Sequence, residues 1–214
     1  MTGDVRIELW DIKAADKALR LSCPVMRRLV AKHGPCGLTI EHGHDVFRAL
    51  SSAILSQQVS GAAAETIKRR VAERGGGDEF PSAKSLLLIP PDDLRACGVS
   101  AAKAQALVDL ATKVNEGDLP TLLKLSQMTD DQVIDALVDV KGVGRWTAEM
   151  FLMFRLGRPD VLSLGDFGLK KGFMRAYGMR TMPSPTTMER KGRLWAPWRS
   201  AASWYLWRAS EAEA

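Results

Sequence analysis

Residues 129–156 read T-D-D-Q-V-I-D-A-L-V-D-V-K-G-V-G-R-W-T-A-E-M-F-L-M-F-R-L, and this stretch predicts two helices joined by a glycine turn. Thr129 followed three residues later by Gln132 has the pattern of a capping box, which begins a helix. Apolar residues then recur at spacings of three and four, as in a helix with one buried face. They are Val133, Ile134, Leu137, Val138 and Val140.

The turn between the two helices is G-V-G at residues 142–144. Glycine tolerates positive φ, and such a turn can gather backbone N–H groups at the N-terminus of the next helix, where they favour a phosphate. Lys141 and Arg145 flank it. A tight turn without a ligand has the same local sequence, so the turn alone leaves both interpretations open. The second helix is expected to end at Gly157 and to bury Trp146, Met150, Met153 and Phe154.

Composition limits the class of protein. The chain has 214 residues, with 30 Lys and Arg against 25 Asp and Glu, and a sequence pI near 9.2. This basic balance permits nucleic-acid binding without establishing it. Three scattered cysteines are too few for a disulfide framework or a four-cysteine metal cluster. The histidine pair His42 and His44 is expected to lie in a solvated loop with no metal.

The N-terminus and the hydropathy pattern bear on location. Acidic residues stand near the N-terminus, where a secretory signal would need a basic and then an apolar run, and no apolar stretch approaches the length of a membrane span. We therefore expect an intracellular protein, cytoplasmic or associated with the nucleoid, with no signal peptide.

The remaining segments favour an all-α fold. No Asn-Gly or Asp-Gly turn joins alternating segments, and the β-branched residues have helical spacing. Helices are predicted over residues 13–33 with a break before Pro24, from Asp45 into S-Q-Q-V-S at 56–60, from Ser60 to the glycines at 75–77, and over the amphipathic segment that Ser100 begins. The tryptophans near the C-terminus have core packing as their default role.

Asp166 lies in L-S-L-G-D-F-G-L-K-K and follows Trp146 by 166 − 146 = 20 residues. An aspartate directly before a helix is a good N-cap, which is the ordinary interpretation. The order of hairpin, apolar helix, loop and aspartate resembles the helix-hairpin-helix (HhH-GPD) superfamily of DNA glycosylases. The segment V-K-G-V-G-R-W-T-A-E-M-F followed by L-G-R-P-D-V is similar to the 3-methyladenine DNA glycosylase II branch. The resemblance covers about residues 20–208, in a minimal form without the N-terminal β-rich domain.

The resemblance implies an architecture of two helical lobes with the active site in the cleft between them. The central lobe is expected over residues 46–158 and contains the hairpin at 129–157. Residues 1–45 together with 159–214 are expected to form the second lobe from both chain ends.

The resemblance also implies an activity. Such an enzyme flips an alkylated purine of the 3-methyladenine or 7-methylguanine type out of double-stranded DNA and hydrolyses its N-glycosidic bond. Asp166 takes the catalytic position, and the base pocket falls on Trp146, Phe167, Trp207 and Met150. A lysine occupies the place of Trp146 in superfamily members that also cut the strand, so we expect a monofunctional enzyme that leaves an abasic site. We expect a monomer without cofactor, apart from a structural monovalent cation on the hairpin carbonyls.

The resemblance further implies which residues contact DNA. Gln58 is expected to fill the gap left by the flipped base, although amides at a helix C-terminus also cap carbonyl groups. The expected DNA contacts are Gln57, Gln58, Lys141, Gly142, Val143, Gly144, Arg145, Thr147 and Lys170.

Two features depart from the family pattern. The stretch before Asp166 reads L-S-L-G instead of a proline-containing loop, and Met150 and Gly168 stand where some relatives have larger residues, which suggests a roomier pocket. Two other functions therefore stay open: a non-catalytic binder of damaged or distorted DNA, and a glycosylase for deaminated or oxidised bases.

Overall fold

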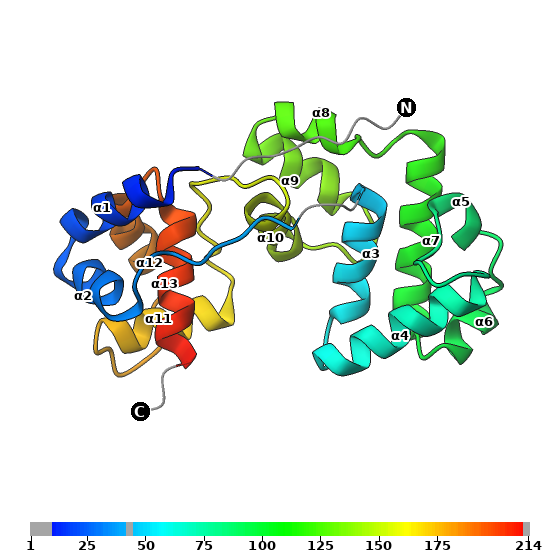
Figure 1. Ribbon diagram of the computed structural model, residues 1–214, viewed down its shortest axis with the longest axis horizontal. Coiled ribbons are helices and arrows are strands. Elements are labelled where there is room, and N and C mark those ends of the chain that lie inside the picture. Colours follow the sequence, from blue (N-terminus) through cyan, green and yellow to red (C-terminus); the bar gives the residue numbers. More distant parts are fainter. Residues whose placement is uncertain (1–9, 42–44, 212–214) are drawn as a thin grey trace. The chain divides into compact units, whose positions relative to one another are not determined.

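The computed structural model describes residues 10–41 and 45–211, and every regular element within these ranges is a helix (Figure 1). The predicted all-α fold is confirmed. His42 and His44 lie outside the described residues, so their loop stays a prediction. None of the helices in the described part of the chain combines the length and hydropathy of a membrane-spanning segment.

The chain divides into two compact units, which are described separately below. Unit 1 contains the described residues 45–148, and unit 2 contains the described residues 10–41 and 149–211. The central lobe was expected to end at residue 158, whereas unit 1 ends at Ala148, inside a helix. The second half of that helix hydrogen-bonds within unit 2, because the Phe154 carbonyl accepts from the Glu41 N–H at 2.8 Å.

Unit 1 is built around one long helix, α7 (Figure 1). Helices α3, α5 and α6 pack against α7, and α4 packs against α3. Serine and threonine side chains at the N-caps accept hydrogen bonds from the first helical turns, as the sequence predicts for Ser60 and Ser100. The helices of unit 1 are α3 (Val46–Ser56), α4 (Gly61–Arg74), α5 (Ala83–Leu86), α6 (Pro91–Ala96), α7 (Ala101–Glu116), α8 (Leu122–Gln127) and α9 (Asp130–Val138), and α10 (Arg145–Phe154) contains the unit boundary.

Unit 2 is organised around α13, which packs against α1, α2 and α11. The break before Pro24 is where it was predicted, and Gly34 with φ of 74° ends the helix that follows. Trp195 and Tyr205 are the largest fully buried side chains of its core, so core packing is confirmed for Trp195. The helices of unit 2 are α1 (Ile12–Ser22), α2 (Pro24–His33), α11 (Phe167–Ala176), α12 (Pro185–Gly192), the 3-10 helix Arg193–Trp195 and α13 (Arg199–Glu211).

A single glycine sets the distance between α11 and α13. A Cβ atom on Gly172 would lie 1.8 Å from the carbonyl oxygen of Leu206, which no side chain can satisfy. The two helices therefore approach to backbone contact at this point. This close packing fixes α11, which Asp166 begins, against α13, which carries Trp207.

Candidate active site and nucleic-acid interface

The hairpin of unit 1 begins as predicted. Thr129 and Gln132 form the capping box, with each side chain accepting from the backbone N–H of the other residue. Val133 and Leu137 are fully buried, whereas Val138 is 39 % exposed at the end of α9. Gly142 has φ of 78°, the left-handed conformation expected of the turn.

Two of the backbone N–H groups in the turn are used inside unit 1. The Val143 N–H donates to the Val140 carbonyl at 3.0 Å, and the Lys141 N–H donates to Asp109 Oδ2 at 2.8 Å. The Lys141 ammonium also donates to Gln105 Oε1 at 2.9 Å, which directs this side chain toward α7. Lys141, Gly142, Gly144 and Arg145 are exposed at the corner.

Two of the expected DNA-contact residues are buried. The exposed fraction is 5 % for Val143 and 6 % for Thr147, so both side chains serve packing within the protein. A DNA contact at either position is restricted to the backbone. The first N–H groups of α10 supply such backbone donors, because the first turn of a helix lacks intrahelical partners.

The cation implied by the family would be held by carbonyl oxygens of this turn. The Val140 carbonyl accepts from Val143, and the Gly142 carbonyl accepts from the side-chain amide of Gln57 at 3.0 Å. Each carbonyl oxygen has two lone pairs, so one acceptor position remains on each. These two carbonyl oxygens of the turn can therefore still act as ligands of a monovalent cation. The cation itself stays a prediction.

The turn between α3 and α4 is tied to the hairpin. The Gln57 amide reaches the Gly142 carbonyl, so this side chain joins the two turns. The ammonium of Lys103 donates to the carbonyls of Leu55 at 2.8 Å and Gln57 at 2.7 Å, which caps the C-terminus of α3. Burial lowers the pKa of Lys103. The sequence analysis missed Lys103, and only its place in the helix after Ser100 could have drawn attention to it.

Gln58 is held in a strained backbone conformation. Its φ is 56°, and it is the non-glycine residue with positive φ among the described residues. Its side chain is exposed. A left-handed conformation costs a non-glycine residue about 1–2 kcal/mol, and such strain is concentrated at functional sites. The turn therefore presents the Gln58 side chain outward at a cost in stability.

Asp166 is the centre of the candidate site in unit 2. It is 8 % exposed and is the N-cap of α11, because its Oδ1 accepts from the Leu169 N–H. The same oxygen accepts from the indole Nε1 of Trp207 at 2.9 Å. Asp166 is thus a helix cap, as the ordinary interpretation expects. The Trp207 indole is a second hydrogen-bond donor to the same carboxylate, and a cap does not require it. A carboxylate that accepts two N–H bonds has a fixed orientation.

Two aromatic rings and one glycine surround this hydrogen bond. The rings of Trp207 and Phe154 are stacked with centroids 6.0 Å apart. A Cβ atom on Gly168 would lie 3.3 Å from Cδ1 of Trp207 and 3.4 Å from Oδ1 of Asp166. The indole therefore occupies the space beside Gly168, and the roomier pocket stays a prediction. The small residue permits the close approach of the indole to the carboxylate.

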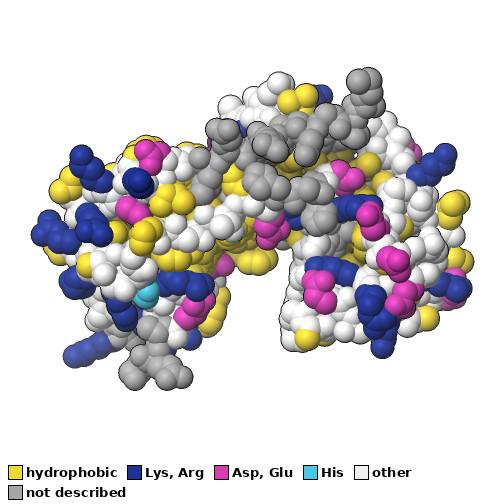
Figure 2. Space-filling view, viewed as in Figure 1, with side chains coloured by type: hydrophobic (Ala, Val, Ile, Leu, Met, Phe, Trp, Pro, Cys, Tyr) yellow, Lys and Arg dark blue, Asp and Glu magenta, His cyan; other side chains and the backbone are white. Residues whose placement is uncertain are grey.

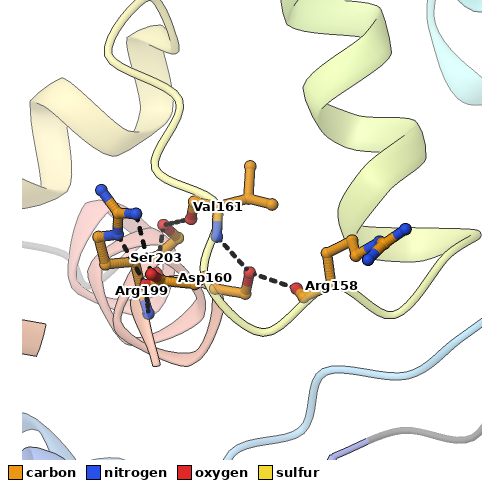
Figure 3. Close-up of polar contacts among 6 residues, drawn as sticks. Arg158, Asp160, Val161, Arg199 and Ser203 are labelled. Atoms are coloured by element: carbon orange, nitrogen blue, oxygen red, sulfur yellow. Dashed lines mark hydrogen bonds and ion pairs between the residues drawn. The ribbon is translucent and has the colours of Figure 1, made fainter. Parts of the chain in front are cut away.

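An ion pair and hydrogen bonds attach the loop that leads to Asp166 to the start of α13 (Figure 3). Arg199 makes a two-pronged ion pair with Asp160, at 2.7 and 2.9 Å. The Ser200 hydroxyl accepts from the Val161 N–H at 3.0 Å and donates to the Arg158 carbonyl at 2.7 Å. These contacts join residues about forty positions apart, so they were not visible in the sequence.

The other expected pocket residues differ in exposure. Phe167, directly after Asp166, is 71 % exposed, and Lys170 lies one turn further along α11 and is half-buried. Trp146 is 49 % exposed, so the expected buried face of α10 includes Met153 but not this ring. Met150 is half-buried. Trp146 belongs to unit 1 and Asp166 to unit 2, and their proximity stays a prediction.

The hairpin has a glycine turn, and the buried Asp166 accepts two hydrogen bonds. A comparison with known protein families agrees with these features. Residues 51–197 match the family described as HhH-GPD superfamily base excision DNA repair protein. The chain therefore belongs to the HhH-GPD superfamily.

Individual members of known function or name are also similar to this chain. An alkylbase DNA glycosidase-like protein of Schizosaccharomyces pombe is 32 % identical over 199 residues, which cover 92 % of this chain and 93 % of the relative. The DNA-3-methyladenine glycosylase 2 of Escherichia coli is 32 % identical over 80 % of this chain and 60 % of its own length.

Solved structures agree. The S. pombe 3-methyladenine DNA glycosylase in complex with abasic DNA has a TM-score of 0.82 at 29 % identity and covers 93 % of this chain and 97 % of its own. A DNA-3-methyladenine glycosidase from Bacillus halodurans has a TM-score of 0.83 at 33 % identity, covering 92 % and 89 %.

Proposed function

We propose that this protein is a base excision repair glycosylase that removes alkylated purines from double-stranded DNA. The observation that carries the proposal is the buried carboxylate of Asp166, held by the Leu169 N–H and the Trp207 indole in a chain whose relatives are named DNA-3-methyladenine glycosylases. A carboxylate that served only as a cap would need one donor. The second donor fixes its direction, which is a requirement of catalysis.

The chemistry proposed for Asp166 is electrostatic. When the N-glycosidic bond breaks, the base leaves with the bonding electron pair, and positive charge develops on the sugar, as in glycoside hydrolysis. A fixed carboxylate stabilises that charge and directs the attacking water, whose oxygen bonds to the anomeric carbon. An alkylated purine of this type is already cationic and leaves readily, so the mechanism needs no general acid.

Aromatic faces select the base. The half-exposed ring of Trp146 and the exposed ring of Phe167 offer stacking surfaces, and stacking on a cationic purine adds a cation–π contribution of about 0.5–2 kcal/mol. A base must first leave the helix, which costs a few kcal/mol and is cheapest for a damaged or badly paired base. The preference for alkylated purines then follows from charge and weak pairing together.

The proposed enzyme has no lyase activity. Strand cleavage by this superfamily requires an amine that forms a Schiff base with the sugar, and Trp146 has no amine at that position. The product is therefore an abasic site in an intact strand, and the protein acts as a monomer.

We assign DNA binding to the hairpin of unit 1 and to the positively charged side chains of the protein. The hairpin corner offers Gly142, Gly144 and the first N–H groups of α10 to a phosphate, and Gln58 fills the gap in the base stack. In unit 2, Lys and Arg outnumber Asp and Glu, whereas in unit 1 they do not. Figure 2 shows many Lys and Arg side chains over α1 and α2. This charge attracts the DNA backbone without reading its sequence.

A panel of duplexes, each with one lesion, tests the proposal. We expect release of 3-methyladenine and 7-methylguanine, measured by chromatography of the free base, and an abasic strand that breaks only on alkaline treatment. Base release from a deaminated or oxidised lesion alone would show a glycosylase of another specificity. Tight binding to abasic DNA with no base released from any lesion would show a non-catalytic binder. A protein–DNA adduct trapped by borohydride would contradict the absence of lyase chemistry.

A further inference from the structure

A buried acid on α10 has no place in the mechanism above. Glu149 is 7 % exposed, although charged side chains are rarely this buried unless they are paired. Its Oε2 accepts from the hydroxyl of Ser163 at 2.5 Å. Ser163 is fully buried and lies in the L-S-L-G segment that precedes Asp166.

Ser163 in turn contacts Asp166 through the backbone. The Asp166 N–H donates to the Ser163 carbonyl at 3.2 Å, which closes the turn that precedes α11. One residue thus links α10 to the turn through its hydroxyl and links the turn to Asp166 through its carbonyl. Both bonds lie within unit 2.

The opposite end of the same loop is held by other contacts. The ion pair of Asp160 with Arg199 and the bonds of Ser200 attach residues 158–161 to α13. Between residue 161 and the α11 N-terminus, the Ser163 hydroxyl attaches the loop to α10. Without a proline to restrict its backbone, this segment depends on such a contact for its conformation.

We propose that Glu149 and Ser163 are positioning residues for Asp166. The Glu149 carboxylate holds the Ser163 hydroxyl, Ser163 holds the turn, and the turn sets where the Asp166 carboxylate points. The proposal rests on the proposed function of Asp166. It gives the buried carboxylate of α10 a role: burying such a group is costly, and its hydrogen bond gives the loop a single arrangement.

Four variants test the proposal in the full-length protein. Ser163→Ala removes the hydroxyl, and Glu149→Met removes the acceptor at similar volume. Glu149→Gln keeps an oxygen that can accept from Ser163, so this variant should retain most of the wild-type rate of base release. Ser51→Ala is the matched control, because Ser51 is a fully buried serine of unit 1 whose hydroxyl has no hydrogen-bond partner among the described residues.

The main readout is the single-turnover rate of base release, beside the affinity for a duplex with an abasic site. Misplacing a catalytic group by a fraction of an ångström to 1 Å costs up to about a hundredfold, so we expect Ser163→Ala to lose about tenfold to a hundredfold in rate. Affinity should stay within about twofold, because the DNA grip is assigned to other residues. The double variant Glu149→Met/Ser163→Ala should be no slower than the worse single variant.

A second readout does not depend on activity. The Trp207 indole N–H donates a hydrogen bond to Asp166 Oδ1, so the NMR resonance of this N–H reports where the carboxylate lies. Ser163→Ala should shift this resonance, and Glu149→Gln and Ser51→Ala should not. An unshifted resonance with a wild-type rate, or losses that add in the double variant, would overturn the positioning role. A shifted resonance in a protein that releases no base would instead refute the proposed function alone.

Discussion

Replacing Trp207 by phenylalanine isolates the hydrogen bond between the indole and the candidate catalytic carboxylate. The phenyl ring keeps an aromatic face beside Phe154, whereas the Nε1–H that lies 2.9 Å from Asp166 Oδ1 is lost. Asp166 keeps the bond from the Leu169 N–H and so still caps α11. The change therefore frees the direction of the carboxylate without removing the carboxylate itself.

The size of the effect follows from the kind of bond that is lost. A hydrogen bond to a charged group contributes about 1.5–3 kcal/mol, and the carboxylate is 8 % exposed, so water replaces the indole poorly. If the whole contribution orients Asp166 in the transition state, the rate falls by about tenfold to about 150-fold, since 1.36 kcal/mol corresponds to about a factor of ten. The free energy of unfolding should fall by a similar amount, because the bond also stabilises the folded state.

The assay is single-turnover release of 7-methylguanine, with thermal unfolding measured on the same preparations. Trp204→Phe is the matched control, because this neighbouring indole on α13 contacts Gly37 and Arg208. We expect the control to retain its rate even where it loses stability. The reasoning is refuted if Trp207→Phe releases base within twofold of the wild-type rate, or if Trp204→Phe loses as much.

Four further outcomes follow from the structure. Gly142→Ala should lower the free energy of unfolding by about 1–2 kcal/mol, because φ is 78° and the new Cβ would lie 3.0 Å from that of Ala106. Gly144→Ala, with nothing within 4 Å of its Cβ, should keep its melting temperature and lose affinity for abasic DNA in a filter-binding assay. Gln58→Gly should unfold at the same temperature or a higher one, because it relieves the left-handed strain, yet release base more slowly from duplex DNA. Burial raises the pKa of the Cys36 thiol from 9.0 to about 12, so the folded protein keeps a proton that the unfolded chain releases above that lower value. This contribution to stability is complete below pH 9 and declines by about 1.4 kcal/mol per pH unit as pH rises toward the folded pKa, and Cys36→Ala should reduce that slope in urea titrations.

Three of these outcomes have a direct contradiction. Equal stability of Gly142→Ala and the wild type would show that the turn adapts to a side chain. A Gln58→Gly variant with unchanged excision would remove Gln58 from the base gap. Parallel pH dependences of the wild type and Cys36→Ala would show that the thiol ionises equally in both states.

Local patterns predicted well where the helices begin, although α10 ends at Phe154 and not at Gly157 as expected. The capping box of Thr129, the caps at Ser60 and Ser100 and the glycine turn at 142 depend on residues within four positions of one another. Asp166 as a helix cap is of the same kind. These contacts are determined by backbone geometry that the sequence displays directly.

Contacts between distant residues could not be predicted in this way. Gln57 was expected to contact DNA, which stays a prediction, and the bond from its amide to a carbonyl 85 residues away was not foreseen. Glu149 was passed over within the motif, although an acid between Ala148 and Met150 on an apolar helix was a visible sign of a buried, bonded carboxylate. Its partner Ser163 depends on how the loop folds back, which no spacing rule specifies.

The most direct test of the account compares Asp166→Asn with the wild-type protein in single-turnover release of 7-methylguanine from a duplex, together with their affinities for the same duplex carrying an abasic site. The amide keeps an oxygen that can cap α11 and accept from the Trp207 indole, so folding and DNA binding should be retained. Loss of the charge should slow base release by at least about a hundredfold. A variant that binds equally well and releases the base at the wild-type rate would show that Asp166 is a cap and that the catalytic group lies elsewhere.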